Sequence, residues 1–307
     1  MRSIATLLAT IGLLTFSRVS GQAQAKYRVN EISSAPVEIS ARPTPVSHVK
    51  EPVRTLTPRG TVVVAPGECF EGTREVDVVF HLHGNPKLVE RAWRRNKINA
   101  ALFIMNHGDT STPYSRRYDY PDAFGQLLTA ADNYIHKLCP DAPRRIGRIA
   151  LSAWSAGYAS IQKLIKYPEN AARVDTVLLA DGLHTGIINK YPRVISEAGL
   201  QPFIEFAEQA KQGKKLFVMT HSSIPTDTFA STTETSNAVL TSLGLTRVVQ
   251  LDDERVGKMK LLSETHEGQF HLQGFSGTQA RDHGDHLRGL DKLVFNHLAQ
   301  RWARPRD

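Results

Sequence analysis

Short apolar runs alternate with amphipathic segments along most of the chain. Six runs are apolar or β-branched at nearly every position and are followed by loop-forming residues, as buried strands are. These runs are residues 76–82, 100–105, 146–151, 176–180, 216–219 and 270–275. Helical periodicity marks residues 123–138, 156–167, 202–212, 233–243 and 287–302. The alternation predicts an α/β fold with a doubly wound, mostly parallel sheet and helices on both faces.

Two segments precede this pattern. Residues 1–25 begin with Arg2, continue as a short apolar run and end in Ala23-Gln24-Ala25, which is the pattern of a cleaved signal peptide. Residues 26–60 are rich in proline and lack a sustained period, so they are predicted to form an irregular arm or linker. Residues 61–307 are long enough for one hydrophobic core and are the expected catalytic domain.

The leader predicts a secreted or periplasmic protein. No later apolar run approaches the roughly 20 residues that a membrane span needs, so no stable span is expected. The two cysteines of the chain, Cys69 and Cys139, could pair in an oxidising compartment, and the sequence leaves this open.

The chain is basic, with a formal net charge of +8. Loss of residues 1–25 removes two arginines and no acid, which leaves about +6. Such a charge suits an anionic surface or polymer as a partner. The bases are scattered and are not interleaved with aromatic residues, so nucleic-acid binding is not expected.

Ser155 follows the apolar run at 146–151 and directly precedes a helical segment. Gly157 stands two residues after it and Ala153 two residues before, where the full Gly-x-Ser-x-Gly pattern has glycine. A nucleophile on a sharp strand-to-helix turn needs small neighbours, and a helix N-terminus favours developing negative charge. The pattern predicts that Ser155 is a nucleophile, and an ordinary N-cap serine is the alternative.

Three segments together resemble the α/β-hydrolase superfamily. The turn around Ser155 is similar to its nucleophile elbow, residues 81–86 to its oxyanion loop, and the region of His283 and His286 to its late histidine before a terminal helix. The resemblance covers about residues 61–302. It implies a serine hydrolase that needs no cofactor and no metal.

The resemblance also implies an oxyanion hole made by the backbone N–H groups of Ala156 and Asn85, with Gly84 allowing close approach. Residues 83–86 are similar to the same loop of haloalkane dehalogenases as well. That subfamily attacks with an aspartate, so Ser155 disfavours dehalogenation. A simple strand-to-loop turn is the alternative for this segment.

The general base is expected on a loop after the last strand. His283 precedes a glycine and lies ahead of Asp285, a candidate N-cap, whereas His286 falls in the first turn of the expected helix. His283 is therefore favoured as the base, and His286 is the alternative.

Asp181 is the predicted acid that orients the histidine, because it directly follows the run at 176–180. No acid follows the run at 216–219, where the family more often carries one. Asp227 and Asp252 remain alternatives. The other role open to Asp181 is that of a turn residue before a glycine.

Trp154 and His83 are expected to contact substrate. Four further aromatic residues could line a cleft or simply pack in the core, namely Trp93, Tyr114, Tyr118 and Tyr120.

The expected activity is hydrolysis of a carboxylic ester, of a small molecule or of a polymer, through an acyl-enzyme on Ser155. The first alternative is an amidase or peptidase acting on cell-wall peptide or acylated polymer. The second is a metal-dependent hydrolase, because side chains suited to metals follow several strands, although at no recognised metal-binding spacing. These are His81, His83, His107, Asp109, Asp181 and His184. The third is a non-catalytic binding protein on a hydrolase scaffold.

Overall fold

The computed structural model describes residues 50–303, all of which belong to one compact unit, His48–Asp307. The predicted signal peptide and most of the predicted arm lie outside the described residues.

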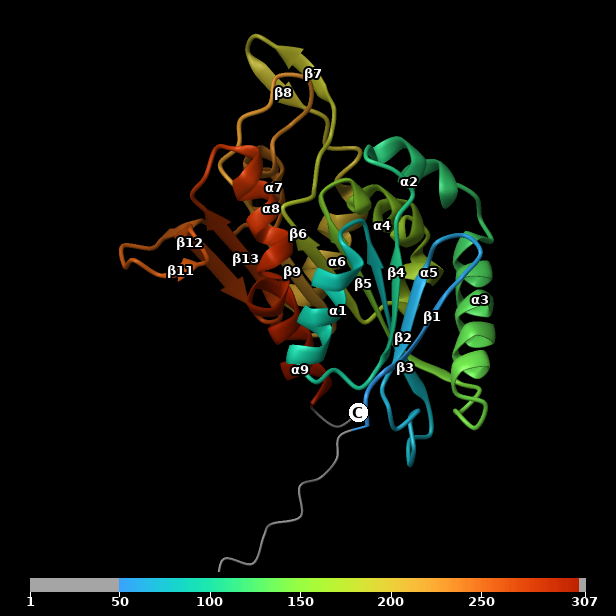
Figure 1. Ribbon diagram of the computed structural model, residues 1–307. Coiled ribbons are helices and arrows are strands. Elements are labelled where there is room, and N and C mark those ends of the chain that lie inside the picture. The colour runs from blue at the N-terminus through green and yellow to red at the C-terminus, as the bar shows by residue number, and fades with distance from the viewer. Residues whose placement is uncertain (1–49, 304–307) are drawn as a thin grey trace, which may run out of the picture. The chain divides into compact units, whose positions relative to one another are not determined.

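A large mixed sheet organises this unit, and between residues 50 and 303 it has eleven strands (Figure 1). Its six central strands run parallel in the order β4-β3-β5-β6-β9-β13. They are β3 (Val76–Leu82), β4 (Ala101–Met105), β5 (Ile146–Trp154), β6 (Thr176–Ala180), β9 (Leu216–His221) and β13 (Phe270–Phe275). Antiparallel strands extend both edges, namely β1 (Val53–Leu56), β2 (Val62–Ala65), β10 (Val248–Val249), β11 (Arg255–Val256) and β12 (Met259–Glu267).

The central strands are mostly apolar because helices cover both faces of the sheet. All seven residues of β3 are buried, and alternate residues face opposite sides, Phe80 in one core cluster and Val79 in the other. One face packs on α1 (Pro86–Arg95), α8 (Ala280–Arg288) and α9 (Asn296–Trp302). The other packs on α2 (Ser111–Arg117), α3 (Ala123–Leu138), α4 (Tyr158–Ile165), α5 (Pro168–Arg173), α6 (Gln201–Lys211) and α7 (Thr232–Ser242). Figure 1 shows these two layers on either side of the sheet.

The predicted fold class is confirmed, and all six predicted strands are present. The prediction of an irregular arm over residues 26–60 is wrong at its end, because β1 lies within it and pairs with β2. The pattern missed this strand because only alternate residues of β1 are half-buried, and its other residues are exposed.

Two features connect distant parts of the unit. Cys69 and Cys139 form a disulfide, which joins the segment after β2 to the end of α3. A separate hairpin of β7 (Ile187–Lys190) and β8 (Arg193–Ile195) follows β6 and projects beyond the strand ends of the main sheet (Figure 1). In the part of the chain that the structure describes, no helix has the length and apolar character needed to cross a membrane.

Candidate functional site

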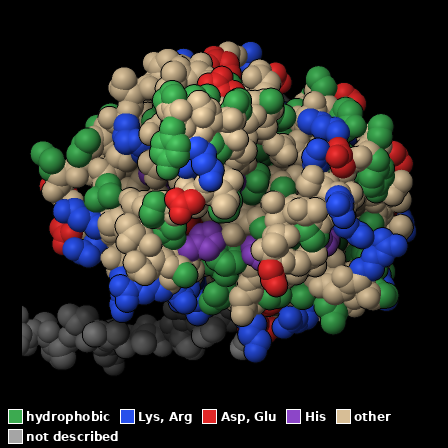
Figure 2. Space-filling view, turned by 90° about the horizontal axis from the view of Figure 1, so that it is seen from above, with side chains coloured by type: hydrophobic (Ala, Val, Ile, Leu, Met, Phe, Trp, Pro, Cys, Tyr) green, Lys and Arg blue, Asp and Glu red, His purple; other side chains and the backbone are tan. Residues whose placement is uncertain are grey.

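The predicted nucleophile and the predicted acid follow two neighbouring strands. Trp154 at the end of β5 lies opposite Ala180 at the end of β6, so Ser155 and Asp181 stand side by side at the carboxyl edge of the sheet. Figure 2 views the molecule from the side of the β7–β8 hairpin and shows histidine side chains near the middle of this face.

Ser155 occupies a strained backbone position. Its φ angle is 51°, in the left-handed region that non-glycine residues seldom adopt. Two glycines allow the chain to turn there. A Cβ on Gly157 would lie 2.1 Å from the carbonyl oxygen of Leu82, and a Cβ on Gly182 would lie 2.5 Å from that of Ser155. Both distances are far below van der Waals contact, so the tight turn requires glycine at both positions.

Asp181 is buried and fully hydrogen-bonded. Its Oδ1 accepts from the Ser222 backbone N–H and from the Thr232 hydroxyl, both at 2.8 Å, and its Oδ2 accepts from His283 Nδ1 at 2.7 Å. Burial by itself would raise the pKa of Asp181. The hydrogen bond from His283, the electrostatic interactions with His286 and His283, and the Ser222 N–H outweigh burial and lower that pKa below its usual range. The side chain is therefore a carboxylate with one oxygen directed at His283.

His283 reaches Asp181 from a helix. The prediction of a loop at His283 with an N-cap at Asp285 is wrong, because α8 begins at Ala280 and its N-cap is Gln279. A capping box between Gln279 and Asp282 starts the helix six residues before the expected N-cap. Within residues 50–303, His283 Nε2 has no hydrogen-bond partner, and the side chain is 26% exposed. The imidazole thus has one nitrogen tied to a carboxylate and the other available.

Trp154 links His283 to a stack of rings. Its ring centroid lies 4.6 Å from that of His283 and its Nε1–H donates to the His283 carbonyl oxygen at 3.0 Å. On its other side Trp154 stacks on His83, with centroids 5.0 Å apart. His83 Nδ1 in turn lies 2.8 Å from the hydroxyl oxygen of Tyr114. Of the two predicted substrate contacts, Trp154 therefore packs directly against the predicted base, and His83 packs against Trp154.

His286, the alternative base, lies one helical turn further along α8. It is completely buried, and its Nδ1 is 2.8 Å from the Thr220 hydroxyl oxygen. Burial lowers its pKa and outweighs the opposing effect of the nearby Asp181. The geometry favours His283, because His286 has no exposed atom that could meet a substrate.

The two predicted oxyanion donors both lie at helix starts. Ala156 is the second residue of the 3₁₀ turn Ser155–Gly157, and Asn85 is the N-cap of α1. Backbone N–H groups at such positions have no partner within their helix. The loop is held by Asn106, whose side chain accepts from the Gly84 N–H at 2.9 Å and donates to the Gly84 carbonyl at 3.0 Å.

Sequence reasoning did not assign these supporting roles to Ser222, Thr232 and Asn106. The capping box at the start of α7, between Ser231 and Glu234, marks Thr232 as a first-turn residue. No sequence signal pairs it with Asp181, which lies 51 positions away along the chain.

The remaining histidines of this edge are bonded within the protein. His81 is buried between the Ser152 hydroxyl and the His83 carbonyl, and burial lowers its pKa to about 3. His184 Nδ1 bonds to the Ala230 carbonyl, and His221 Nε2 lies 2.7 Å from Arg247. Among the residues described here, no group of three or more His, Cys, Asp or Glu side chains is arranged to hold a metal ion.

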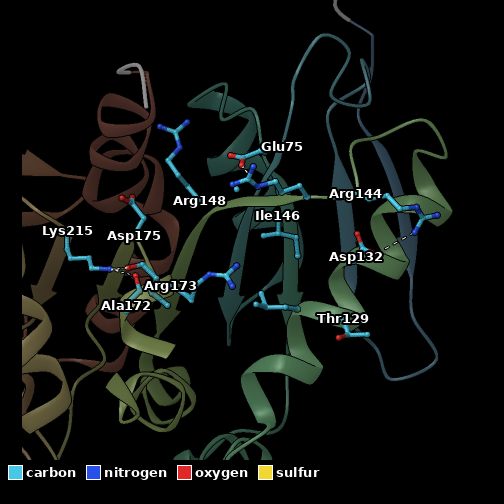
Figure 3. Close-up of a pocket in the computed structure, with 14 residues that line it drawn as sticks. Glu75, Thr129, Asp132, Arg144, Ile146, Arg148, Ala172, Arg173, Asp175 and Lys215 are labelled. Atoms are coloured by element: carbon cyan, nitrogen blue, oxygen red, sulfur yellow. Dashed lines mark hydrogen bonds and ion pairs between the residues drawn. The ribbon is translucent and has the colours of Figure 1, made fainter. Parts of the chain in front are cut away.

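A basic cavity of about 760 Å³ lies at the opposite, amino edge of the sheet (Figure 3). Its acids are paired: Glu75 with Arg145, Asp132 with Arg144, and Asp175 with Arg301. Its lysine, Lys215, donates to the carbonyl oxygens of Ala171, Ala172 and Val174 at the end of α5. These contacts join strand beginnings to one another and to neighbouring helices.

The sheet is parallel at its centre, and a strained serine follows β5. Asp181 and His283 are hydrogen-bonded beside that serine. The fold is α/β-hydrolase-like. Asp181 follows β6, whereas β9 ends in Thr220 and His221 with no acid.

No family model matches the chain, and no curated protein does. The chain is similar to several solved structures. One is a CE1 ferulic acid esterase from the anaerobic fungus Anaeromyces mucronatus, which is 12% identical in sequence. The alignment covers 81% of this chain and 91% of that chain, with a TM-score of 0.43. Another is poly(aspartic acid) hydrolase-1 from Sphingomonas sp. KT-1, with 13% identity, 80% and 99% coverage and a TM-score of 0.45. A third is a cold-adapted esterase from an Arctic intertidal metagenomic library, with 12% identity, 79% and 92% coverage and a TM-score of 0.37. At such low identity, no residue of this chain takes its role from these structures.

Proposed function

We propose that the protein is an exported serine hydrolase that cleaves carboxylic esters through an acyl-enzyme on Ser155. The observation that carries the proposal is the hydrogen bond from His283 to Asp181 beside the strained turn of Ser155. A buried carboxylate, an imidazole that it orients and a serine on a tight turn are the parts that nucleophilic acyl transfer needs.

In the first half of the reaction, His283 Nε2 takes the proton of the Ser155 hydroxyl as Oγ bonds to the ester carbonyl carbon. The carbonyl oxygen becomes an oxyanion and accepts hydrogen bonds from the N–H groups of Ala156 and Asn85. The intermediate then releases the alcohol, which leaves with the proton from His283. Asp181 stays ionised and stabilises the imidazolium, which is consistent with its lowered pKa.

In the second half, water attacks the acyl carbon and gives one proton to His283 Nε2. The second tetrahedral intermediate collapses, Ser155 Oγ regains the proton, and the carboxylic acid leaves. No cofactor enters either half of the reaction. Esters are the expected substrates, because an amide requires stronger protonation of its leaving group by the same base.

Export is proposed on the signal-like leader, 1–25, and it is supported by the disulfide between Cys69 and Cys139. Disulfides persist in oxidising compartments and are rare in a reducing cytosol. An anionic surface or polymer is proposed as a partner on the basis of the net positive charge.

The test is to treat the mature protein with a fluorophosphonate and map the adduct by peptide mass spectrometry. Wild type, Ser155→Ala and the control Ser242→Ala, an exposed serine at the end of α7, are then assayed on matched ester and amide panels. We expect an adduct on Ser155 alone, and ester turnover that Ser155→Ala abolishes and Ser242→Ala leaves unchanged.

An adduct on another residue, or undiminished turnover by Ser155→Ala, would contradict the proposal. Activity that is lost on chelation without phosphonate labelling would indicate a metal-dependent hydrolase. Faster turnover of the amide panel would replace the esterase by an amidase that uses the same residues.

A further inference from the structure

A second cavity of about 760 Å³ lies between the β1–β2 turn and helices α2 and α3. Its volume is within the range of small-molecule sites in proteins. Phe80, Phe103 and Met105, from the ends of β3 and β4, are among the apolar residues that line it. Tyr118, predicted from the sequence as a candidate cleft residue, lines it as well.

The charged residues of this cavity are two arginines without acidic partners. Arg59 comes from the β1–β2 turn and Arg117 is the last residue of α2, and both are exposed. No aspartate or glutamate lines the cavity, and within residues 50–303 neither arginine forms an ion pair.

The acids that follow Arg117 in sequence are already engaged elsewhere. Asp119 binds Lys163 and Lys166, and Asp122 accepts from the side-chain amide of Gln126 at 3.1 Å. The cavity at the amino edge is different, because each acidic residue that lines it pairs with an arginine. Arg117 hydrogen-bonds to the Tyr118 side chain, but no acid neutralises either guanidinium group, so Arg59 and Arg117 can both bind an anion from outside.

Neutral polar groups complete the wall between the arginines. His107 Nε2 lies 3.1 Å from the Tyr118 hydroxyl oxygen, and burial lowers the pKa of His107 to about 4, so its ring is uncharged near neutral pH. The Tyr120 hydroxyl donates to Gln126 at 3.0 Å. The cavity thus combines an apolar floor with a positive rim.

We infer that this cavity is a binding site for an organic monocarboxylate with an aromatic or aliphatic body. The apolar body would lie on the accessible lining side chains of α3, namely Leu127, Ala130 and Tyr134, since Phe80, Phe103 and Met105 are themselves buried. The carboxylate would bind Arg59 and Arg117. Arginine binds carboxylates through paired, charge-assisted hydrogen bonds, which favours this headgroup over a neutral one.

The site is distinct from the proposed catalytic residues. Tyr114 lies between the cavity and the catalytic residues. Its hydroxyl oxygen accepts from the backbone N–H of His107, a cavity residue, at 3.1 Å and is 2.8 Å from His83 Nδ1. Tyr114 is completely buried, so it separates the cavity from the stack of His83 and Trp154. Binding in the cavity therefore does not depend on ester hydrolysis or on Ser155.

The experiment is calorimetric titration of the mature protein with phenylbutyrate and with its neutral analogue phenylbutyramide. The proteins are wild type, Ser155→Ala, Arg59→Gln, Arg117→Gln and the control Arg173→Gln. Arg173 is an exposed arginine of the amino-edge cavity and does not line the proposed site, so its substitution removes the same charge from a different cavity. Circular dichroism checks that each variant is folded.

We expect one saturable site per chain for phenylbutyrate, with equal affinity in wild type, Ser155→Ala and Arg173→Gln. Arg59→Gln and Arg117→Gln should each weaken binding about tenfold, and the amide should bind at least about tenfold more weakly than the carboxylate. Absence of saturable binding, or equal binding by the arginine variants and the control, would overturn the inference. So would binding that disappears when the phosphonate occupies Ser155, since the probe would then lie in the catalytic site.

Discussion

The indole of Trp154 stacks on the imidazole of His283 and also donates a hydrogen bond to the His283 backbone carbonyl. Trp154 immediately precedes Ser155, so one residue fixes the base relative to the nucleophile. The electron-rich indole face is also placed to stabilise an imidazolium. Trp154 is therefore expected to act as a positioning residue for His283, in addition to the substrate contact predicted from its sequence position.

Trp154→Leu should lower kcat about 100-fold, because loss of the stack displaces the base from its reacting geometry. Trp154→Phe keeps an aromatic ring but loses the N–H donor and part of the indole face, so a loss of about tenfold is expected. The measurement is kcat and KM on one ester over a range of pH. The control is Trp93→Phe, since Trp93 is buried in the core and its Nε1 has no partner among the described residues. A rise in KM at constant kcat would indicate that Trp154 only contacts substrate.

Asp181→Asn should lower kcat about ten-thousandfold while leaving the protein folded. The amide no longer stabilises the imidazolium, and it favours the wrong tautomer of His283. Single-turnover assays with an activated ester measure this loss. Asp227→Asn, at an exposed position that the sequence left as an alternative acid, should behave as wild type. Equal losses in the two variants would remove Asp181 from the proposed mechanism.

The lowered pKa of Asp181 gives a pH dependence of stability with a definite sign. A carboxyl whose pKa is depressed on folding stabilises the native state above its unfolded pKa of about 3.9. That contribution is lost as the pH falls through the folded pKa. Urea unfolding measures how much more stable wild type is than Asp181→Asn. This stability difference should be about 1 kcal/mol smaller at pH ~3 than at pH ~6.5. A difference that grows on acidification would contradict the ionised state of Asp181.

His286 is expected to serve stability and not catalysis. His286→Leu should lower the free energy of unfolding by about 2 kcal/mol, because the buried Thr220 hydroxyl loses its partner. Adding Thr220→Val removes that unpaired hydroxyl and should recover part of the loss. Ester kcat/KM at 25 °C should stay near wild type in His286→Leu and fall by orders of magnitude in His283→Leu. The reverse pattern would make His286 the base.

The sequence determined the layered fold and the position of the candidate nucleophile. Continuous apolar runs buried on both faces of a sheet are a local signal, and so are small residues on either side of Ser155. Asp181 was also predicted locally, because it directly follows the apolar run of β6. In each case the information lies within a few neighbouring residues.

The tertiary structure decided what depends on distant contacts. The partnership of Asp181 and His283 joins positions 102 residues apart, and the choice between His283 and His286 follows from which face of α8 is buried. The sequence suggested a loop at His283, because Gly284 is a poor helix former, but α8 runs through this position. Its capping box and the packing of Leu287 against the core outweigh that weak local preference. The support of Asp181 by Ser222 and Thr232 likewise appears only when β9 and α7 are brought beside β6.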